Sequence, residues 1–299
     1  MTRTFRIPLR VRFRGVTERA GVLVRGPHGW GEFSPFPEYG PPVTRAWRAA
    51  AIEAATQPWP EPVRSSIPVN AIVPAVGPQQ AHDMTVASGC STVKVKVAEG
   101  DDEARVEAVR AALGPDGRIR IDANGAWDVD TAEKMIGVLG RYDLEYVEQP
   151  VATLEEMAEL RRRVDVPLAA DESVRTAEDP LRVKGLDAAD VVVLKVQPLG
   201  GVRRCLEVAE AAGLPAVVSS AVETSIGLAA GVALGAALPE LPYACGLGTL
   251  SLLEGDVVAD PLVPRNGALE VRRPEVDEAA LRRYETTDTE LLARWEAAS

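Results

Sequence analysis

Six chemically reactive residues recur along the chain at nearly even intervals: Lys96, Asp122, Glu148, Asp171, Lys195 and Ser219. The steps between them are 26, 26, 23, 24 and 24 residues. A step of about 25 residues is the length of one strand–loop–helix–loop unit in a parallel α/β barrel. Because the carboxyl ends of barrel strands converge on one mouth, the spacing predicts a pocket that holds two ammonium groups and three carboxylates.

The three acidic residues, Asp122, Glu148 and Asp171, each close or directly follow a run that is typical of a strand. Carboxylates are the hard oxygen ligands that suit Mg²⁺, with Mn²⁺ as a substitute. Acidic residues at strand ends also cap the next helix, but three in step on adjacent strands favour a metal site. Glu172 is next to Asp171, so the pattern alone does not choose between them. Asn124 is expected to orient a ligand, or to serve as an ordinary turn residue.

Lys94 and Lys96 are two residues apart, so both point to the same face of their strand. Burying them is costly unless carboxylates face them, and burial with mutual repulsion lowers a lysine pKa toward that of a usable base. Lys195 ends the interior run VVVL. Arg120, one layer deeper than Asp122, is expected to bind a substrate carboxylate, to neutralise the acidic cluster, or to form an internal ion pair. The alternatives for the lysines are an exposed edge strand, or a position at the barrel rim.

Small and polar residues end the last two predicted strands. Ser219 and Ser220 end the seventh, and both are candidates for substrate binding. Gly246 and Gly248 end the eighth, where missing side chains are expected to leave room for substrate.

The surrounding elements divide the chain into three stretches. Residues 1–65 predict a small α+β unit, with strands before and after residue 28 and a helix beginning at Thr44 as N-cap. Residues 66–249 predict eight strands with about seven helices between them, an α/β barrel. Residues 250–299 are polar, with short strand-like pieces, and are expected to return to the N-terminal unit.

The composition excludes several classes of function. Of 299 residues, 33 are basic and 44 acidic, a net charge of −11 without a basic run, which argues against nucleic-acid binding. No apolar stretch is long enough to span a membrane, no signal peptide is visible, and the three widely spaced cysteines favour a cytoplasmic protein. The only histidines, His28 and His82, are not at predicted strand ends, which argues against a histidine base or metal site. The expected partner is a small molecule, and the oligomeric state is not indicated.

A set of motifs carries a resemblance to a known family. They are K-x-K (94–96), D-A-N (122–124), V-E-Q-P (147–150), D-E-S (171–173) and Lys195. Together they resemble the enolase superfamily, muconate-lactonizing subgroup. The resemblance implies a (β/α)₇β barrel that binds Mg²⁺ and a capping domain, to which the stretch GWGEFSPFP (29–37) is similar.

Within the superfamily, three segments resemble the o-succinylbenzoate synthases of menaquinone biosynthesis: 120–122, 219–225 and 246–250. The resemblance implies dehydration of 2-succinyl-6-hydroxy-2,4-cyclohexadiene-1-carboxylate to 2-succinylbenzoate, with Lys96 moving the protons and Lys195 supplying charge. The alternatives are N-acylamino acid racemase and muconate cycloisomerase. In a racemase, Lys195 would be the second base. A rival of another class is a non-catalytic barrel that keeps its ions for stability.

Overall fold

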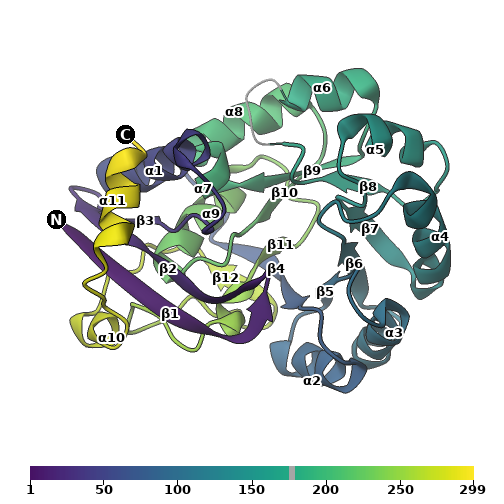
Figure 1. Ribbon diagram of the computed structural model, residues 1–299, viewed down its shortest axis with the longest axis horizontal. Coiled ribbons are helices and arrows are strands. Elements are labelled where there is room, and N and C mark those ends of the chain that lie inside the picture. Colours follow the sequence, from purple (N-terminus) through teal and green to yellow (C-terminus); the bar gives the residue numbers. More distant parts are fainter. Residues whose placement is uncertain (175–178) are drawn as a thin grey trace.

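A computed structural model describes residues 1–174 and 179–299 of the chain (Figure 1). Within these residues, eight parallel strands follow one another around a closed barrel, and the last strand pairs with the first. This confirms the predicted fold. The strands are β4 (Ser66–Val73), β5 (Thr92–Lys96), β6 (Arg118–Asp122), β7 (Leu144–Glu148), β8 (Leu168–Ala170), β9 (Val191–Lys195), β10 (Ala216–Ser219) and β11 (Cys245–Gly248).

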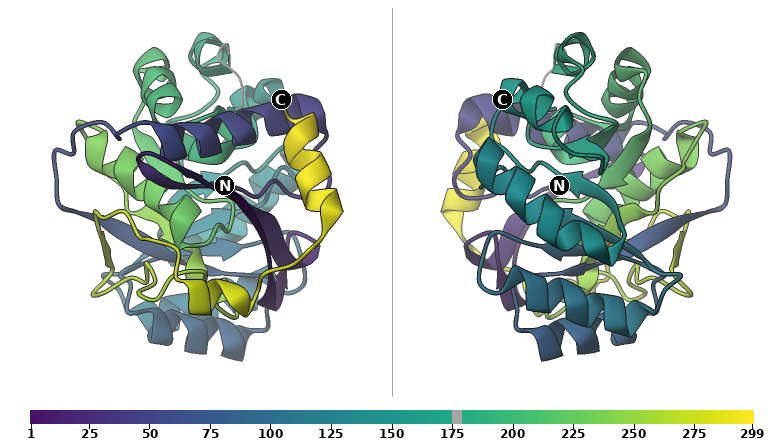
Figure 2. Two further views of the ribbon diagram at one scale, coloured as in Figure 1. Left: turned by 90° about the vertical axis from the view of Figure 1, so that its left-hand side faces the viewer. Right: turned by 90° about the vertical axis from the view of Figure 1, so that its right-hand side faces the viewer.

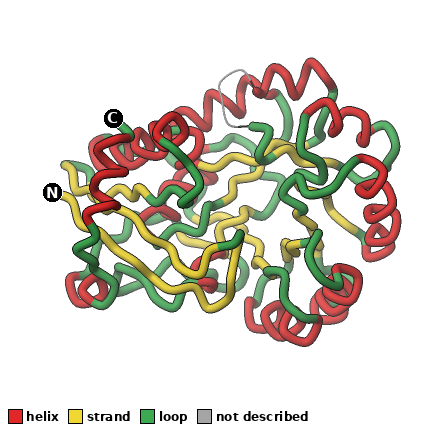
Figure 3. The backbone as a smooth tube through the Cα atoms, viewed as in Figure 1, coloured by secondary structure: helices red, strands yellow, loops and turns green. Residues whose placement is uncertain are grey.

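Helices cover the outside of the barrel (Figure 3). They are α2 (Pro78–Ser88), α3 (Asp102–Leu113), α4 (Val129–Leu139), α5 (Leu154–Arg161), α6 (Asp179–Leu186), α8 (Val202–Ala212) and α9 (Ser225–Ala237), with the short α7 (Val196–Leu199) and two 3₁₀ turns, η1 (Gly140–Tyr142) and η2 (Thr249–Leu252). Alternation along β5 buries Val93 and Val95 in the hydrophobic core. The intervening lysines of that strand therefore point into the barrel.

The N-terminal part forms an antiparallel sheet with the order β1-β2-β3. Its elements are β1 (Thr2–Phe13), β2 (Val16–Gly26), β3 (Gly29–Phe33) and the helix α1 (Pro41–Thr56). The prediction that Thr44 caps α1 is wrong: the helix begins three residues earlier, after Gly40, with Pro41 and Pro42 at its first positions. Proline suits the first turn of a helix because its fixed φ is already helical and it has no N–H to leave unpaired.

The C-terminal part contacts both the sheet and the barrel. It contains β12 (Ala268–Glu270), α10 (Glu278–Arg282) and α11 (Thr289–Ala297). β12 pairs with the barrel strand β4, whereas bridges from Glu285 to Phe5 and from Leu253 to Leu9 join the tail to β1. The tail therefore connects the N-terminal sheet to the barrel.

Two hydrophobic clusters matter for the site. The larger lies between the barrel strands and their helices and extends into the N-terminal sheet and the C-terminal tail, for example at Phe5, Ile7 and Leu281. A second cluster joins the sheet and α1 to α11 and to one barrel residue, Ala221; its buried members include Phe33, Phe36, Trp47 and Leu291. The views in Figure 2 show α11, in yellow, lying against α1 and the N-terminal strands. The N-terminal sheet is thus packed against one wall of the barrel mouth.

Candidate active site

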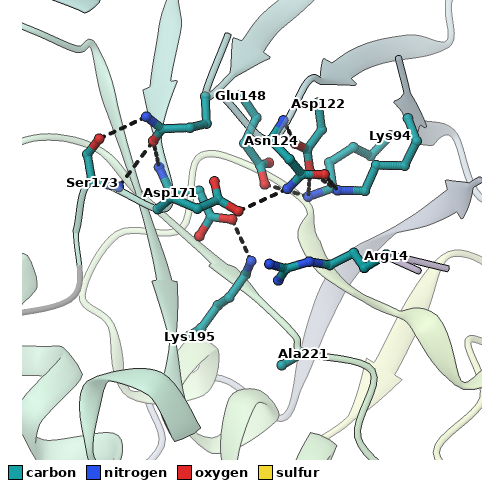
Figure 4. A network of polar contacts seen from close by, with 12 residues as sticks. Arg14, Lys94, Asp122, Asn124, Glu148, Asp171, Ser173, Lys195 and Ala221 are labelled. Atoms are coloured by element: carbon teal, nitrogen blue, oxygen red, sulfur yellow. Dashed lines mark hydrogen bonds and ion pairs between the residues drawn. The ribbon is translucent and has the colours of Figure 1, made fainter. Parts of the chain in front are cut away.

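The predicted acidic residues come together at the carboxyl ends of neighbouring strands (Figure 4). Strand register places Lys96 beside Asp122, and Asp122 beside Glu148. Asp171 directly follows β8, the next strand of the barrel. All three carboxylates are buried, with exposed fractions of at most 1%.

Lysine ammonium groups lie between these carboxylates. Lys94 Nζ donates to Glu148 Oε1 over 2.6 Å and lies 3.0 Å from Asp122 Oδ2. Lys96 Nζ donates to the same Asp122 oxygen over 2.5 Å. Lys195 Nζ, at the end of the neighbouring strand β9, donates to Asp171 Oδ2. The structure therefore brings the three lysines and three carboxylates predicted from the sequence into one network.

The network shifts the pKa values of its members in opposite directions. Burial lowers the pKa of Lys96 below its usual range, although the Asp122 carboxylate acts against this, and the Lys94 ammonium group adds to it. Burial opposes ionisation of Asp122, but Lys94 and Lys96 overcome it and hold the Asp122 pKa well below its usual value. The Lys94 pKa is raised well above its usual value because Asp122 and Glu148 outweigh burial. Lys96 is therefore the lysine of this pair that is closer to acting as a base.

The donor set fits a divalent cation. In the described ranges, no group of three or more histidine, cysteine or acidic side chains already lies in a position to hold a metal ion. Lys94 Nζ lies 3.0 Å from Asp122 Oδ2 and 2.6 Å from Glu148 Oε1. Burial and the neighbouring Asp122 carboxylate raise the pKa of Glu148 to about 8. Three buried carboxylates at neighbouring strand ends are hard oxygen ligands of the kind that Mg²⁺ prefers.

Two amide side chains fix the strand ends. Asn124 accepts a hydrogen bond from Lys96 Nζ over 2.6 Å and donates to Glu172 over 2.9 Å, so it connects the candidate base to the strand β8 side of the mouth. Gln149 accepts from the backbone N–H groups of Asp171 and Ser173 over 3.0 and 3.2 Å. The sequence analysis includes Gln149 in the motif V-E-Q-P but assigns it no role, although its place directly after Glu148 was a usable signal.

Arg120 lies one layer below the carboxylates, as expected, but its guanidinium group is engaged elsewhere. It pairs with Glu145 over 2.5 Å, donates to Asn70 and to the Ala244 carbonyl over 3.0 and 2.6 Å, and stacks on Tyr146. Among the roles expected for Arg120, the geometry favours the internal ion pair over a substrate contact.

The ends of β10 and β11 are packed tightly together. A Cβ atom on Gly246 would lie 2.6 Å from Ser219 Oγ, and one on Gly248 would lie 2.5 Å from the Asn70 carbonyl oxygen. Ser220 Oγ and Thr249 Oγ1 share a hydrogen bond of 2.8 Å. Ser219, Ser220 and Gly246 line the inner cavity together with the lysines. Gly248 does not line that cavity. Its missing side chain instead allows the backbones of Gly248 and Asn70 to approach closely, so Gly248 does not make room for substrate.

The N-terminal sheet adds residues that sequence reasoning did not select. The β1–β2 hairpin tip carries Phe13 and Arg14 to the cavity, and Phe36 from the loop after β3 also lines it. Lys96 Nζ lies 5.4 Å from the centre of the Phe13 ring, and Figure 4 shows the Arg14 guanidinium pointing toward Lys195. Nothing in the local pattern of β1 indicates contact with a lysine about eighty residues later.

Comparisons with known proteins agree with this geometry. Residues 78–275 match the family described as Enolase C-terminal domain-like, and residues 4–55 match Enolase N-terminal domain-like. The chain is 65% identical to the o-succinylbenzoate synthase of Thermobifida fusca, over 99% of this chain and 95% of that protein. It is 51% identical to the o-succinylbenzoate synthase of Mycolicibacterium smegmatis, over 92% of this chain and 87% of that protein.

Solved structures show the same fold at low identity. A muconate lactonizing enzyme from Pseudomonas fluorescens superposes with a TM-score of 0.83 at 23% identity, over 95% of this chain and 98% of that one. An N-succinyl Arg/Lys racemase from Bacillus cereus superposes with a TM-score of 0.81 at 22% identity, over 95% of this chain and 96% of that one. Among the described residues, no helix is both long and apolar enough to cross a membrane. The chain belongs to the enolase superfamily and, within it, to the o-succinylbenzoate synthase family.

Proposed function

We propose that this protein dehydrates 2-succinyl-6-hydroxy-2,4-cyclohexadiene-1-carboxylate to 2-succinylbenzoate, the o-succinylbenzoate synthase reaction of menaquinone biosynthesis. The observation that carries the choice of substrate is the 65% identity to a named o-succinylbenzoate synthase over nearly the whole chain. The chemistry is supported by the buried lysines and carboxylates at the barrel mouth. The expected location is the cytoplasm, and the expected partner is a small-molecule substrate that carries a carboxylate.

Lys96 performs the proton transfers. In its neutral form, Lys96 Nζ takes the proton from the ring carbon that bears the carboxylate, and burial favours that neutral form. The ammonium group formed then gives a proton to the hydroxyl group on the adjacent carbon as its C–O bond breaks. One water leaves, the new C=C bond completes the aromatic ring, and Lys96 returns to its starting state.

Lys195 supplies positive charge from the opposite side. β5 and β9 are four strands apart in either direction around the closed barrel, so Lys96 and Lys195 approach a bound substrate from opposite sides. Loss of the proton turns the substrate carboxylate into an enediolate with more negative charge. A fixed ammonium group in a buried site stabilises this charge without having to reorganise.

Asp122, Glu148 and Asp171 would hold one Mg²⁺, and Mn²⁺ would serve in its place as a substitute. When bound, the ion polarises the substrate carboxylate as a Lewis acid and makes its neighbouring proton more acidic. Arg14 is our candidate for the distant succinyl carboxylate, because it lines the inner cavity with Ser219 and brings a positive charge from the hairpin tip.

The proposal is tested by assaying the pure protein with the cyclohexadiene substrate, with Mg²⁺ and with chelator. We expect turnover that requires the metal and is abolished in Lys96→Ala, which should also lose exchange of the acidic proton with solvent deuterium. Lys134→Ala, a change at an exposed lysine of α4, is the matched control and should keep full activity.

The same samples separate the alternatives. Efficient racemisation of N-succinyl amino acids with weak dehydration would identify a racemase, in which each lysine acts as a base on one face of the carbon. Absence of turnover with dehydration, racemisation and muconate substrates, in the presence of Mg²⁺, would favour the non-catalytic barrel and contradict our proposal.

A further inference from the structure

The loop that follows β3, residues 34–40, separates the candidate active site from the C-terminal helix α11. Its sequence is Ser-Pro-Phe-Pro-Glu-Tyr-Gly, and it belongs to no helix or strand. Pro35 and Pro37 have no N–H group to donate, and the loop carbonyls have no ladder of partners. The loop therefore depends on donors from other elements to hold its shape.

On its inner side, the loop presents Phe36 to the site. The Phe36 ring lines the same cavity as Lys96 and Lys195. The guanidinium groups of Arg19 and Arg14 lie 4.0 and 4.7 Å from the ring centre, so the ring is in contact with two cations. The position of Phe36 thus affects both the apolar wall of the cavity and the placement of Arg14.

On its outer side, the loop is held by Arg294 of α11. Arg294 Nη2 donates to the Phe36 carbonyl over 3.0 Å and to the Tyr39 carbonyl over 3.1 Å. These two residues are the ends of a turn that is closed by a hydrogen bond from Tyr39 N–H to the Phe36 carbonyl over 3.2 Å. One guanidinium group therefore bridges both ends of the turn, and hydrogen bonds from a charged donor are stronger than neutral ones.

Helix α11 is itself fixed to the N-terminal sheet. Asp288 caps it by accepting a hydrogen bond from Glu290 N–H over 2.9 Å. The ring of Trp295 meets Phe33 edge to face, with centres 5.3 Å apart, and Leu291 is buried in the same cluster as Phe36. A nine-residue helix is marginal on its own in water, so these contacts determine where Arg294 is held.

We propose that Arg294 is a positioning residue for the substrate site, acting through the loop 34–40 on Phe36 and Arg14. This inference rests on the proposed function. Arg294 itself does not line the inner cavity. The loop contacts the segment after Lys195 through Ser34, which shares hydrogen bonds of 3.1 and 3.2 Å with Gln197, whereas Arg294 holds the other part of the loop. Lys96 and Lys195 are themselves paired with Asp122 and Asp171 of the barrel. Loss of Arg294 therefore changes the fit of the substrate and leaves the proton transfers intact.

The test compares steady-state kinetics of three variants. Arg294→Met removes the donors and keeps the aliphatic packing, so we expect KM to rise about tenfold, as the loss of one net hydrogen bond to a charged group predicts, while kcat stays within about twofold. Arg294→Lys keeps one charged donor and should give an intermediate KM. Arg283→Met, a change at an exposed arginine of the same tail, should leave KM unchanged. A merely structural role would instead lower Tm and the amount of active enzyme, and so kcat, without moving KM.

A double-mutant cycle identifies the route of the effect. If Arg294 acts through Phe36, the increase in KM caused by Arg294→Met should shrink in a Phe36→Leu background, because coupled residues give non-additive effects. An unchanged KM in Arg294→Met, or an equal increase in both backgrounds, would overturn the inference.

Hydrogen exchange provides a measurement that is independent of the reaction. Exchange at the amides of residues 36–40, followed by mass spectrometry, should be faster in Arg294→Met than in the wild type and in Arg283→Met. If the wild type turned over no cyclohexadiene substrate, the proposed function would fail, whereas faster exchange in Arg294→Met would still support the positioning role. Equal exchange in all three proteins would overturn it.

Discussion

The amide oxygen of Asn124 accepts a hydrogen bond from the ammonium group of Lys96, the candidate base, over 2.6 Å. Asn124 has a positive φ of 49°, which asparagine and glycine tolerate better than other residues. Asn124→Gly should therefore keep the backbone and remove the contact. We expect kcat to fall about 10–100-fold, as is typical when a group that orients a site residue is lost.

The control for this change is thermal stability. Asn124→Gly should keep a Tm close to that of the wild type, since the left-handed backbone is retained. A variant that keeps full kcat would show that Lys96 is positioned without Asn124, and the assigned role would be wrong.

Replacing Glu148 should remove the metal site. Glu148→Gln keeps the shape of the side chain and removes one of three carboxylate charges, so we expect no detectable dehydration and a much weaker affinity for Mg²⁺. In the wild type, Mg²⁺ at a hundredfold excess over Kd should stabilise the fold by about 2.7 kcal/mol. Thermal unfolding with and without Mg²⁺ measures this effect directly, without reference to activity.

The matched control is Glu155→Gln, which changes an exposed glutamate of α5. Mg²⁺ should raise the thermal stability of this variant as much as that of the wild type. If Glu148→Gln were stabilised by Mg²⁺ as strongly as the wild type, the ion would bind elsewhere and the proposed ligands would be incorrect.

Gly246 and Ser219 form a tight contact that can be relieved from either side. In Gly246→Ala the new methyl group would lie 2.6 Å from Ser219 Oγ, so we expect a loss of stability of about 1–3 kcal/mol from overpacking. The double variant Ser219→Gly/Gly246→Ala should recover much of that loss in urea unfolding. Gly137→Ala is the control, because a Cβ atom at Gly137 meets nothing within 4 Å. Equal stabilities of the single and double variants would contradict the contact.

Much of the fold could be predicted because the barrel repeats a simple unit. The step of about 25 residues and the buried strands place the reactive residues at strand ends, whatever the loops between them do. The alternation Val93, Lys94, Val95, Lys96 gives the face of each side chain from the two-residue period of a strand. The cost of burying a lysine then requires carboxylates nearby, and the structure places them there.

Other features depend on contacts between distant segments, which local patterns do not reveal. Arg14 reaches the cavity only because the hairpin folds over the barrel mouth. Gly248 was expected to leave room for substrate, but it allows backbones to approach closely. The two-residue strand period placed Arg120 one layer deeper than Asp122 in the barrel. The same pattern did not predict that Glu145 is the ion-pair partner of Arg120. The limits of the capping domain stay a prediction, and the pairing of β12 with β4 shows that part of the tail lies on the barrel.

Glu32, in β3, joins the N-terminal sheet to the barrel. It accepts hydrogen bonds from the N–H groups of Thr224 and Gly227, at the start of α9, and from the hydroxyl group of Ser34. Burial raises its pKa to about 7, and the nearby Glu223 carboxylate adds to this, although Arg19 and the hydrogen bonds act against it.

This shift predicts a pH dependence of stability. A carboxyl group with a raised pKa binds its proton more tightly in the folded state, so its contribution is present below about pH 4.5 and is lost as pH rises toward 7. The folded state loses about 3 kcal/mol of stability over this range, because each unit of difference between the folded and unfolded pKa contributes about 1.4 kcal/mol. Glu32→Gln cannot titrate, so its free energy of unfolding in urea should fall less between pH 5 and pH 8 than that of the wild type. Equal slopes in the two proteins would mean that Glu32 keeps an ordinary pKa and ionises freely at this junction.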